Sequence, residues 1–321
     1  MTLDVDVAAA FTAAGAETFA VDVGFGVDPG ESLVVLGPSG SGKTLLLECI
    51  AGIHDHEGAV VSAGTDVTDR PPERRDFGFV FQDYALFPHL SVRQNVEYGV
   101  RYHEDTRDPD TLLAELGVAD LAERYPPTLS GGEKQRGALA RSLAIRPGVM
   151  LLDEPLASLD VPTRQTLRED LTGVLEDVTT VYVTHNRTTA RAIADRIAVM
   201  NDGEIVQTGD PEEVFERPAS PMVADFTGSN VIDLEAAPTL QSALDGEVAA
   251  AGTLAIRPQA VRIGGETGDV RATVEQVVRE DATSRVTVAI DGVAIDAFVD
   301  APPSVGEEVR VWLPRDRLHP C

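Results

Sequence analysis

The chain has 321 residues, 53 aspartates and glutamates against 26 lysines and arginines, and a formal net charge of −27. This length predicts two domains, and 43% apolar residues suffice to bury their cores, which excludes a disordered acidic tail. The charge argues against direct nucleic-acid binding, because that binding needs basic groups to displace counterions. With only two lysines, Lys43 and Lys134, the surface fits a protein of a salt-rich cytoplasm; ordinary acidic drift is the alternative.

Cysteine usage and the N-terminus bear on where the protein works. Cys49 and Cys321 are too few for a disulfide framework, and the start MTLDVDVAAA lacks the basic residues and apolar core of a signal peptide. No apolar run approaches the roughly 18 residues that a spanning helix needs. We therefore expect a cytosolic chain whose membrane work goes through partner proteins.

Residues 1–230 alternate apolar runs of strand length with longer helical patterns. Runs that are apolar throughout are typical of strands covered by helices on both faces, so this part predicts a mainly parallel α/β sheet. A helical pattern over about residues 84–145 predicts a helical subdomain inserted in that core. The clearest strand-like runs are 32–37, 149–153, 180–185 and 197–200.

The remaining chain has a different character. Residues 231–252 are rich in alanine, glycine and aspartate and read as a linker. Residues 253–321 contain five short alternating runs separated by glycine, proline or aspartate, with no long helical pattern. This predicts a small all-β, OB-like barrel as a second domain.

A phosphate-binding turn is predicted where GPSGSGKT fits the pattern G-x-x-x-x-G-K-[ST], directly after an apolar strand and before a helical run. Its glycines let backbone N–H groups turn inward, and the new helix adds its positive end. Lys43 can reach the β- and γ-phosphates of ATP, and Thr44 can place its hydroxyl on Mg²⁺. The predicted nucleotide-binding residues here are Gly37, Pro38, Ser39, Gly40, Ser41, Gly42, Lys43 and Thr44.

Polar residues end three other predicted strands. Asp153 and Glu154 stand at the end of one apolar run, where one carboxylate could hold Mg²⁺ and the other could polarise a water. Gln82 and His185 end two more. Taken singly, each is also compatible with an ordinary strand-end hydrogen-bonding group.

The segment LSGGE supplies a second candidate phosphate site. Ser130 and Glu133 have the capping-box spacing of a helix N-terminus. A cap alone does not explain Gly131 and Gly132, which weaken the first turn but allow backbone N–H groups to approach a ligand closely.

Taken in order, these motifs resemble the nucleotide-binding subunit of an ATP-binding cassette (ABC) transporter, over residues 1 to about 230. The resemblance implies an ATP hydrolase with a P-loop NTPase core that uses ATP and Mg²⁺. It departs from the common pattern at Glu133, where glutamine is frequent, at Gly137 and at Asn186. The roles it implies are a Walker A turn at 37–44, catalytic residues Glu154, His185 and Gln82, Mg²⁺ ligands Thr44, Gln82 and Asp153, a signature at Ser130, Gly131, Gly132 and Glu133, and a D-loop at Ser158, Leu159 and Asp160.

Family members work as head-to-tail homodimers in which the signature of one subunit caps the γ-phosphate held by the other. An aromatic residue near the N-terminus is expected to stack on adenine. Phe11 is the candidate by spacing, and Phe19 is the rival.

The tail resembles a TOBE domain, most clearly in LAIRPQAVRI, which implies an importer ATPase. Two transmembrane permease subunits are the expected partners, at a groove beside Gln82, Tyr84 and Phe87, with an extracytoplasmic solute-binding protein acting indirectly. This places the chain on the cytoplasmic face of the membrane.

Among importers, the sequence resembles most closely the subunits for molybdate or tungstate, with sulfate, ferric iron, sugar and polyamine importers as alternatives. A soluble ABC ATPase acting on DNA or ribosomes is disfavoured, because such proteins need a coiled-coil insertion or a second cassette and a surface charge compatible with nucleic acid. A small-molecule P-loop kinase would have no reason for the glycine pair or for a separate barrel.

Overall fold

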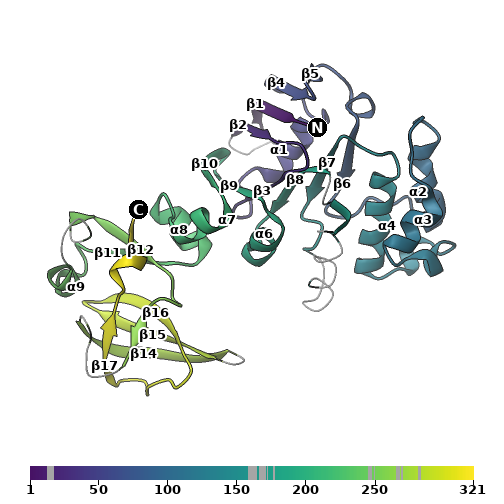
Figure 1. Ribbon diagram of the computed structural model, residues 1–321. Coiled ribbons are helices and arrows are strands. Elements are labelled where there is room, and N and C mark those ends of the chain that lie inside the picture. The colour runs from purple at the N-terminus through teal and green to yellow at the C-terminus, as the bar shows by residue number, and fades with distance from the viewer. Residues whose placement is uncertain are drawn as a thin grey trace. The chain divides into compact units, whose positions relative to one another are not determined.

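The computed structural model divides the chain into two compact units, Met1–Thr208 and Gly209–Cys321, each with its own buried apolar core (Figure 1). This division falls before the predicted boundary at residue 230. The difference arises because helices α7 (Pro211–Glu216) and α8 (Pro221–Thr227) pack with each other, and α8 packs on strands of the second unit. The structure describes residues 1–12, 18–157, 165, 171, 173–175, 178–244, 248, 250–264, 268, 270–280 and 283–321.

Within the described residues, the first unit is built on a ten-stranded sheet in the order β5-β4-β1-β2-β10-β9-β3-β8-β7-β6. The strands from β9 to β6 pair in parallel wherever their register is defined, as the continuous apolar runs predict. Their bounds are β3 (Ser32–Leu36), β6 (Phe77–Val80), β7 (Val149–Asp153), β8 (Thr179–Thr184), β9 (Arg196–Asn201) and β10 (Glu204–Gly209).

An antiparallel flank extends this sheet on one side, which the expectation of a mainly parallel sheet does not include. Strand β1 pairs with β2 on one edge and with β4 on the other, and both pairings are antiparallel. Alternating burial along β1 shows one face on the core and one toward solvent. The flanking strands are β1 (Leu3–Phe11), β2 (Phe19–Val27), β4 (Glu57–Ser62) and β5 (Thr65–Asp66).

The helix that follows the phosphate turn, α1 (Lys43–Ile50), is anchored at its C-terminal end by a buried arginine. The Arg75 guanidinium donates to the carbonyl oxygens of Cys49 (3.2 Å) and Ile50 (2.7 Å). Carbonyls at a helix end have no partner within the helix, and a cation also complements the negative end of the helix dipole. This contact fixes the helix that carries Lys43 and Thr44.

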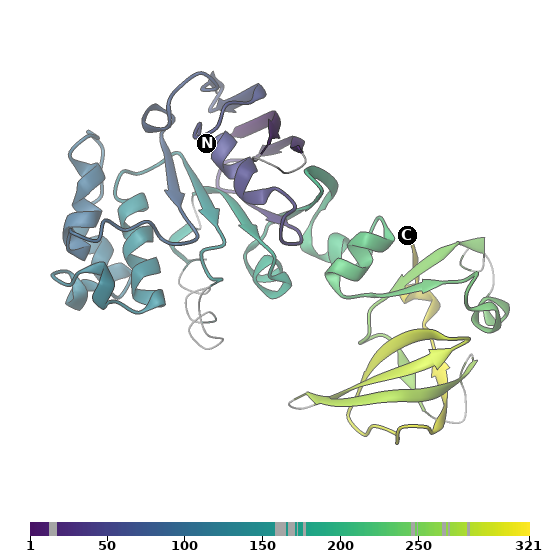
Figure 2. The ribbon, with the colours of Figure 1, turned by 180° about the vertical axis from the view of Figure 1, so that it is seen from behind.

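A group of helices forms the predicted helical subdomain at one end of the first unit (Figure 1 and Figure 2). Helix α4 packs on both α2 and α3, and also on strand β6. The subdomain is thereby connected to the strand that ends just before Gln82. The helices are α2 (Val92–Val100), α3 (Pro109–Glu115) and α4 (Gly131–Leu143), and α6 (Arg187–Ile193) follows β8 in the sheet core.

The second unit contains two antiparallel sheets in its described residues, ordered β11-β12-β18 and β13-β17-β14-β15-β16. They form a β half-barrel, which confirms the small all-β second domain expected from sequence. The predicted linker over 231–252 contributes to this unit, because β11 pairs with β12 and Leu240 of α9 is fully buried. The elements are β11 (Asn230–Asp233), α9 (Pro238–Ala243), β12 (Thr253–Ile256), β13 (Arg262–Ile263), β14 (Val270–Glu280), β15 (Thr283–Ile290), β16 (Val293–Val299), β17 (Glu308–Trp312) and β18 (His319–Pro320).

Candidate active site

A pocket of about 400 Å³ opens where parallel strands of the first unit end. Strands β3, β7 and β8 are neighbours and parallel, so their carboxyl ends lie along one edge of the sheet, where α/β folds place their ligands. Residues far apart in the chain therefore meet here. The lining consists of Phe19, Ser39, Gly40, Gly42, Lys43, Thr44, Leu45, Gln82, Glu154 and His185.

The phosphate turn between β3 and α1 has a backbone that requires glycine. Gly42 has a φ of +98°, in the left-handed region. A Cβ at Gly37 would lie 2.2 Å from the carbonyl oxygen of Met200 on β9. Only glycine therefore allows the backbone after β3 to lie this close to β9. The loop is thus shaped by both its own conformation and its neighbours before any ligand binds.

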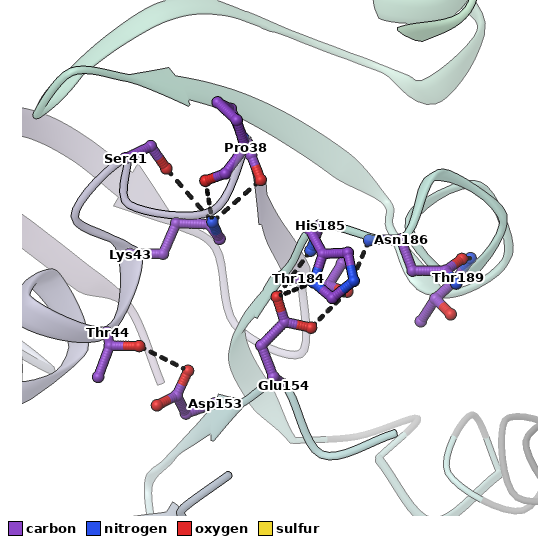
Figure 3. Close-up of polar contacts among 11 residues, drawn as sticks. Pro38, Ser41, Lys43, Thr44, Asp153, Glu154, Thr184, His185, Asn186 and Thr189 are labelled. Carbon is purple, nitrogen blue, oxygen red and sulfur yellow. Dashed lines mark hydrogen bonds and ion pairs between the residues drawn. The ribbon is translucent and has the colours of Figure 1, made fainter. Parts of the chain in front are cut away.

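Lys43, the first residue of α1, folds back over the turn and is only 6% exposed (Figure 3). Its Nζ donates to the carbonyl oxygens of Gly37 (3.0 Å) and Pro38 (2.8 Å) and lies 3.3 Å from Ser41 Oγ. Burial lowers the pKa of Lys43, and the nearby carboxylates of Glu154 and Asp153 oppose this shift. The ammonium group is therefore held at the turn without an ion-pair partner in direct contact among the described residues.

Asp153 and Thr44 form the next contact of the site. Thr44 Oγ1 donates to Asp153 Oδ1 at 3.1 Å. Asp153 is 3% exposed, and burial raises its pKa to about 6, with Glu154 and Glu48 adding to the shift and the Thr44 hydrogen bond and Lys43 opposing it. Asp153 is thus a buried carboxylate whose one side-chain hydrogen bond among the described residues comes from the Thr44 hydroxyl.

The raised pKa predicts how Asp153→Asn changes stability. The folded pKa, about 6, lies above the ordinary aspartate value of about 3.9, so this carboxyl destabilises the wild type increasingly as pH rises from about 4 to about 6, and by a constant amount above that. Asparagine does not ionise. Between pH 4 and pH 8 the variant should therefore gain about 2 kcal/mol in free energy of unfolding relative to wild type, measured by urea titration. Asp4→Asn, on the exposed face of β1, removes the same charge and should show no such gain. The prediction would be contradicted if the difference in free energy of unfolding between Asp153→Asn and wild type did not change with pH.

Glu154 sits in a strained backbone position directly after β7, with a φ of +43°. Its carboxylate accepts three contacts from the end of β8 (Figure 3). Thr184 Oγ1 donates to Oε2 at 3.1 Å, the His185 backbone N–H donates to Oε1 at 2.8 Å, and His185 Nδ1 lies 2.6 Å from Oε1. Glu154 and His185 are thus brought together at the pocket, where a water could be oriented by the carboxylate.

The loop after β6 is connected to α4 by an arginine that sequence reasoning missed. Gln82 lines the pocket, and the following Tyr84 and Ala85 have left-handed backbones. Arg141 of α4 donates to the carbonyl oxygens of Ala85 (2.6 Å) and Tyr84 (3.1 Å), and it stacks over the Phe87 ring at 5.6 Å. Arg141 thus connects α4 directly to the loop that carries Gln82.

The predicted capping box is present at the start of α4. Glu133 N–H donates to Ser130 Oγ (3.4 Å), and Ser130 N–H donates to Glu133 Oε2 (2.7 Å). The pKa of Glu133 is lowered, chiefly by the hydrogen bond from the Ser130 backbone. Ser130, Gly131, Gly132 and Glu133 are not among the described residues that line the pocket.

Two further predictions have different outcomes. Among the described residues the pocket is lined by Phe19 and not by Phe11, although the two are paired across β1 and β2. The Phe11 ring instead makes an edge contact with His54, with centroids 5.3 Å apart. Ser158, Leu159 and Asp160, predicted as a D-loop, lie outside the described residues.

Sequence reasoning also missed Thr184, whose hydroxyl touches Glu154. The available signal was weak, because in TVYVTH the apolar run ends on two polar residues, Thr184 and His185, and the pattern alone does not show that the first reaches the site. Only the pairing of β7 with β8 shows that the first also faces the carboxylate.

Comparisons with known proteins agree with this geometry. A family model described as ABC transporter matches residues 21–157, and one described as TOBE domain matches residues 254–320. The chain is 42% identical over 275 residues to the sulfate/thiosulfate import ATP-binding protein CysA of Nocardia farcinica, covering 83% of this chain and 78% of that protein. It is 40% identical over 279 residues to the Fe(3+) ions import ATP-binding protein FbpC of Agrobacterium fabrum, covering 79% and 78%.

A solved structure gives a further match. It is a dimeric post-hydrolysis state of the ATP-binding cassette MJ0796 bound to ADP and Pi, with a TM-score of 0.59 and 28% sequence identity. The match covers 66% of this chain and 99% of that one. Curated relatives and solved structure thus agree on the class of nucleotide-binding unit.

Proposed function

This chain belongs to the ABC transporter family of ATP-hydrolysing subunits, and from that premise we propose that it powers an importer of sulfate or a related oxyanion. The observation that carries the ATP-hydrolysing part of the proposal is the pocket that gathers the phosphate turn, Gln82, Glu154 and His185 at one sheet edge. In hydrolysis, a water oxygen bonds to the γ-phosphorus, the bond to the β–γ bridging oxygen breaks, and Glu154 accepts the proton of the water.

The choice of solute departs from the expectation of molybdate or tungstate. The relatives with which this chain shares 40–43% identity over most of its length are named for import of sulfate and thiosulfate or of Fe(3+). Sulfate is a tetrahedral oxyanion, as molybdate is. The solute passes through the permease and does not touch this subunit, so the active-site residues do not indicate which solute is carried. Similarity to the named relatives therefore supports the choice of solute. Ferric iron is the second candidate.

We propose that two copies of the chain together make the complete ATP site. The pocket presents Lys43 to the phosphates, whereas the glycine pair of the signature lies elsewhere in the same chain. A second copy arranged head to tail would bring its α4 N-terminus to the γ-phosphate, where free N–H groups and the helix dipole favour the negative charge. The matched cassette structures are dimeric, which supports this arrangement.

Thr44, Asp153 and Gln82 would hold Mg²⁺ with the phosphates of ATP. The fit rests on chemistry: a hydroxyl, a buried carboxylate and an amide supply the hard oxygen ligands that Mg²⁺ prefers, and Asp153 has a buried charge that a cation would compensate. When bound, the ion would neutralise charge on the phosphates.

Phe19 is favoured over Phe11 as the adenine-stacking ring, because it packs over Gly42 within the pocket.

An aromatic surface on the helical subdomain is the proposed docking site for the permease. Phe87 contacts Tyr98 with ring centroids 4.6 Å apart, and Tyr98 and Tyr102 are 41% and 74% exposed. Arg141 connects this surface to the Gln82 loop. Among the residues that the structure describes, none of the helices is long and apolar enough to cross a bilayer. We therefore propose that two permease subunits hold the chain at the cytoplasmic face of the membrane, with an extracytoplasmic solute-binding protein delivering the solute.

Co-purification and transport test this proposal together. The tagged full chain should bring down a membrane permease, and inverted or right-side-out vesicles carrying the complex should show ATP-dependent movement of radiolabelled sulfate that unlabelled thiosulfate suppresses. Uptake of labelled molybdate or ferric iron in place of sulfate would reassign the solute. Recovery with ribosomes or DNA and without any membrane protein would contradict the importer function.

We also propose that the net charge of −27 adapts the protein to concentrated salt. Screening shortens from about 8 Å at 0.15 M to about 3 Å at 1 M ionic strength, which weakens repulsion between surface carboxylates. The unfolding temperature in scanning calorimetry should therefore rise with KCl, by about 2 to 4 °C for each kcal/mol of repulsion removed. A constant or falling unfolding temperature between 0.15 M and 2 M KCl would leave ordinary acidic drift as the explanation.

A further inference from the structure

We propose that Thr184 is a positioning residue for ATP hydrolysis, which holds the carboxylate of Glu154 in one orientation. The inference rests on the proposed role of Glu154 as the base. Thr184 is the last residue of β8 and is 2% exposed, so water does not compete for its hydroxyl. The hydroxyl contacts two groups, the Asn186 backbone N–H at 3.0 Å and Glu154 Oε2 at 3.1 Å.

These two contacts fix the direction of the hydroxyl proton. A threonine hydroxyl has one proton to donate and lone pairs to accept. The backbone N–H of Asn186 can only donate, so the hydroxyl accepts there and its single proton is available for Glu154 Oε2. The hydrogen bond to the carboxylate is therefore not exchanged with any other acceptor among the described residues.

The acceptor side of the hydroxyl is itself anchored to a helix. Asn186 is the N-cap of α6, and its Oδ1 accepts a hydrogen bond from Thr189 N–H at 2.9 Å (Figure 3). The chain of contacts from α6 through Asn186 to Thr184 ends on Glu154. The contact at Oε2 is thus anchored to a secondary-structure element, while Oε1 is held by the backbone N–H and the imidazole of His185.

The two oxygens of Glu154 have different side-chain partners, so the role of Thr184 can be distinguished from that of His185. The His185 side chain is 53% exposed and contacts Oε1, whereas Thr184 is buried and contacts Oε2. If the imidazole turns to the γ-phosphate, its contact with Oε1 is lost. The Thr184 hydroxyl then continues to hold Oε2 and keeps the carboxylate on the attacking water.

The test compares Thr184→Val, which keeps the shape but removes the hydroxyl, with Thr184→Ser, which keeps the hydroxyl. ATP turnover of the full chain with MgATP should show kcat about tenfold lower for the valine variant, as expected for one lost hydrogen bond to a charged group. KM for MgATP should stay within about twofold, because Thr184 is not among the described residues lining the pocket. The serine variant should restore kcat.

Thr180→Val is the matched control. Thr180 lies on the same strand and is fully buried, but its hydroxyl donates to the Val178 carbonyl oxygen at 2.9 Å and not to the site. Its kcat should equal that of wild type, and thermal unfolding of all three variants shows whether each is folded. An equal loss of kcat in Thr180→Val, or no rescue by serine, would overturn the proposal in favour of a structural role.

The outcomes also separate this inference from the proposed function. If wild type hydrolyses ATP, Glu154→Gln abolishes turnover and Thr184→Val keeps the wild-type kcat, the role of Thr184 alone is wrong. If the wild-type chain shows no ATP turnover under any condition, the proposed function itself fails.

Discussion

Replacing Glu154 with glutamine should leave ATP bound while slowing its hydrolysis by about 10²- to 10⁴-fold, the usual contribution of a positioned general base. The amide has the shape of the carboxylate but cannot accept the proton of the attacking water. Its carbonyl oxygen can still accept from Thr184 Oγ1 or from the His185 backbone N–H. The strained backbone at residue 154 is retained, so the pocket should keep its form.

Bound ATP that is not cleaved should also hold two copies together, since the nucleotide would lie between them. Steady-state phosphate release gives the turnover, and light scattering with MgATP gives the mass. Glu73→Gln, on an exposed turn away from the pocket, makes the same chemical change and should alter neither. Turnover within about twofold of wild type would remove Glu154 from the role of base.

Lys43→Ala should lower the affinity for MgATP by about 10- to 100-fold, as expected when charge-assisted hydrogen bonds worth about 1.5–3 kcal/mol are lost. In the ligand-free chain the Nζ is held by the carbonyl oxygens of Gly37 and Pro38. Phosphate oxygens are stronger acceptors for an ammonium group than neutral carbonyls are. We expect the lysine to transfer from the turn to the β- and γ-phosphates on binding.

The chain provides its own control for this substitution. Lys134 is the other lysine of the sequence, and it lies on α4 and not among the described residues of the pocket. Lys134→Ala removes the same charge and should leave the affinity of the separate chain unchanged. Titration calorimetry at a protein concentration that keeps the chain monomeric measures both variants. Wild-type affinity in Lys43→Ala would overturn the assignment of the phosphate turn.

Local motifs could be predicted because their chemistry depends on consecutive residues. The strand, turn and helix around Lys43 require glycine at fixed positions, and the capping box requires Ser130 and Glu133 three residues apart. Each of these patterns is set by backbone geometry within a few residues. The sequence therefore specifies them without reference to the remaining fold.

Other features could not be predicted because they depend on packing between distant segments. Sequence spacing favoured Phe11 over Phe19. Their strands pair the two residues directly, but only side-chain placement brings Phe19 to the pocket. Residues 231–252 have the composition of a linker, yet Ile232 and Leu240 are fully buried. Their elements are too short for a hydrophobic period to be recognised.

The sequence by itself predicted a phosphate-binding turn at residues 37–44, because such a turn makes its site from its own backbone. Only the tertiary structure decided which side chains meet beside this turn. The parallel order β3-β8-β7 brings the ends of three separate strands to one edge, so Glu154 meets both His185 and Thr184 beside the phosphate turn. The strand pairing that brings these residues together depends on long-range contacts, which the spacing of residues along the chain does not predict.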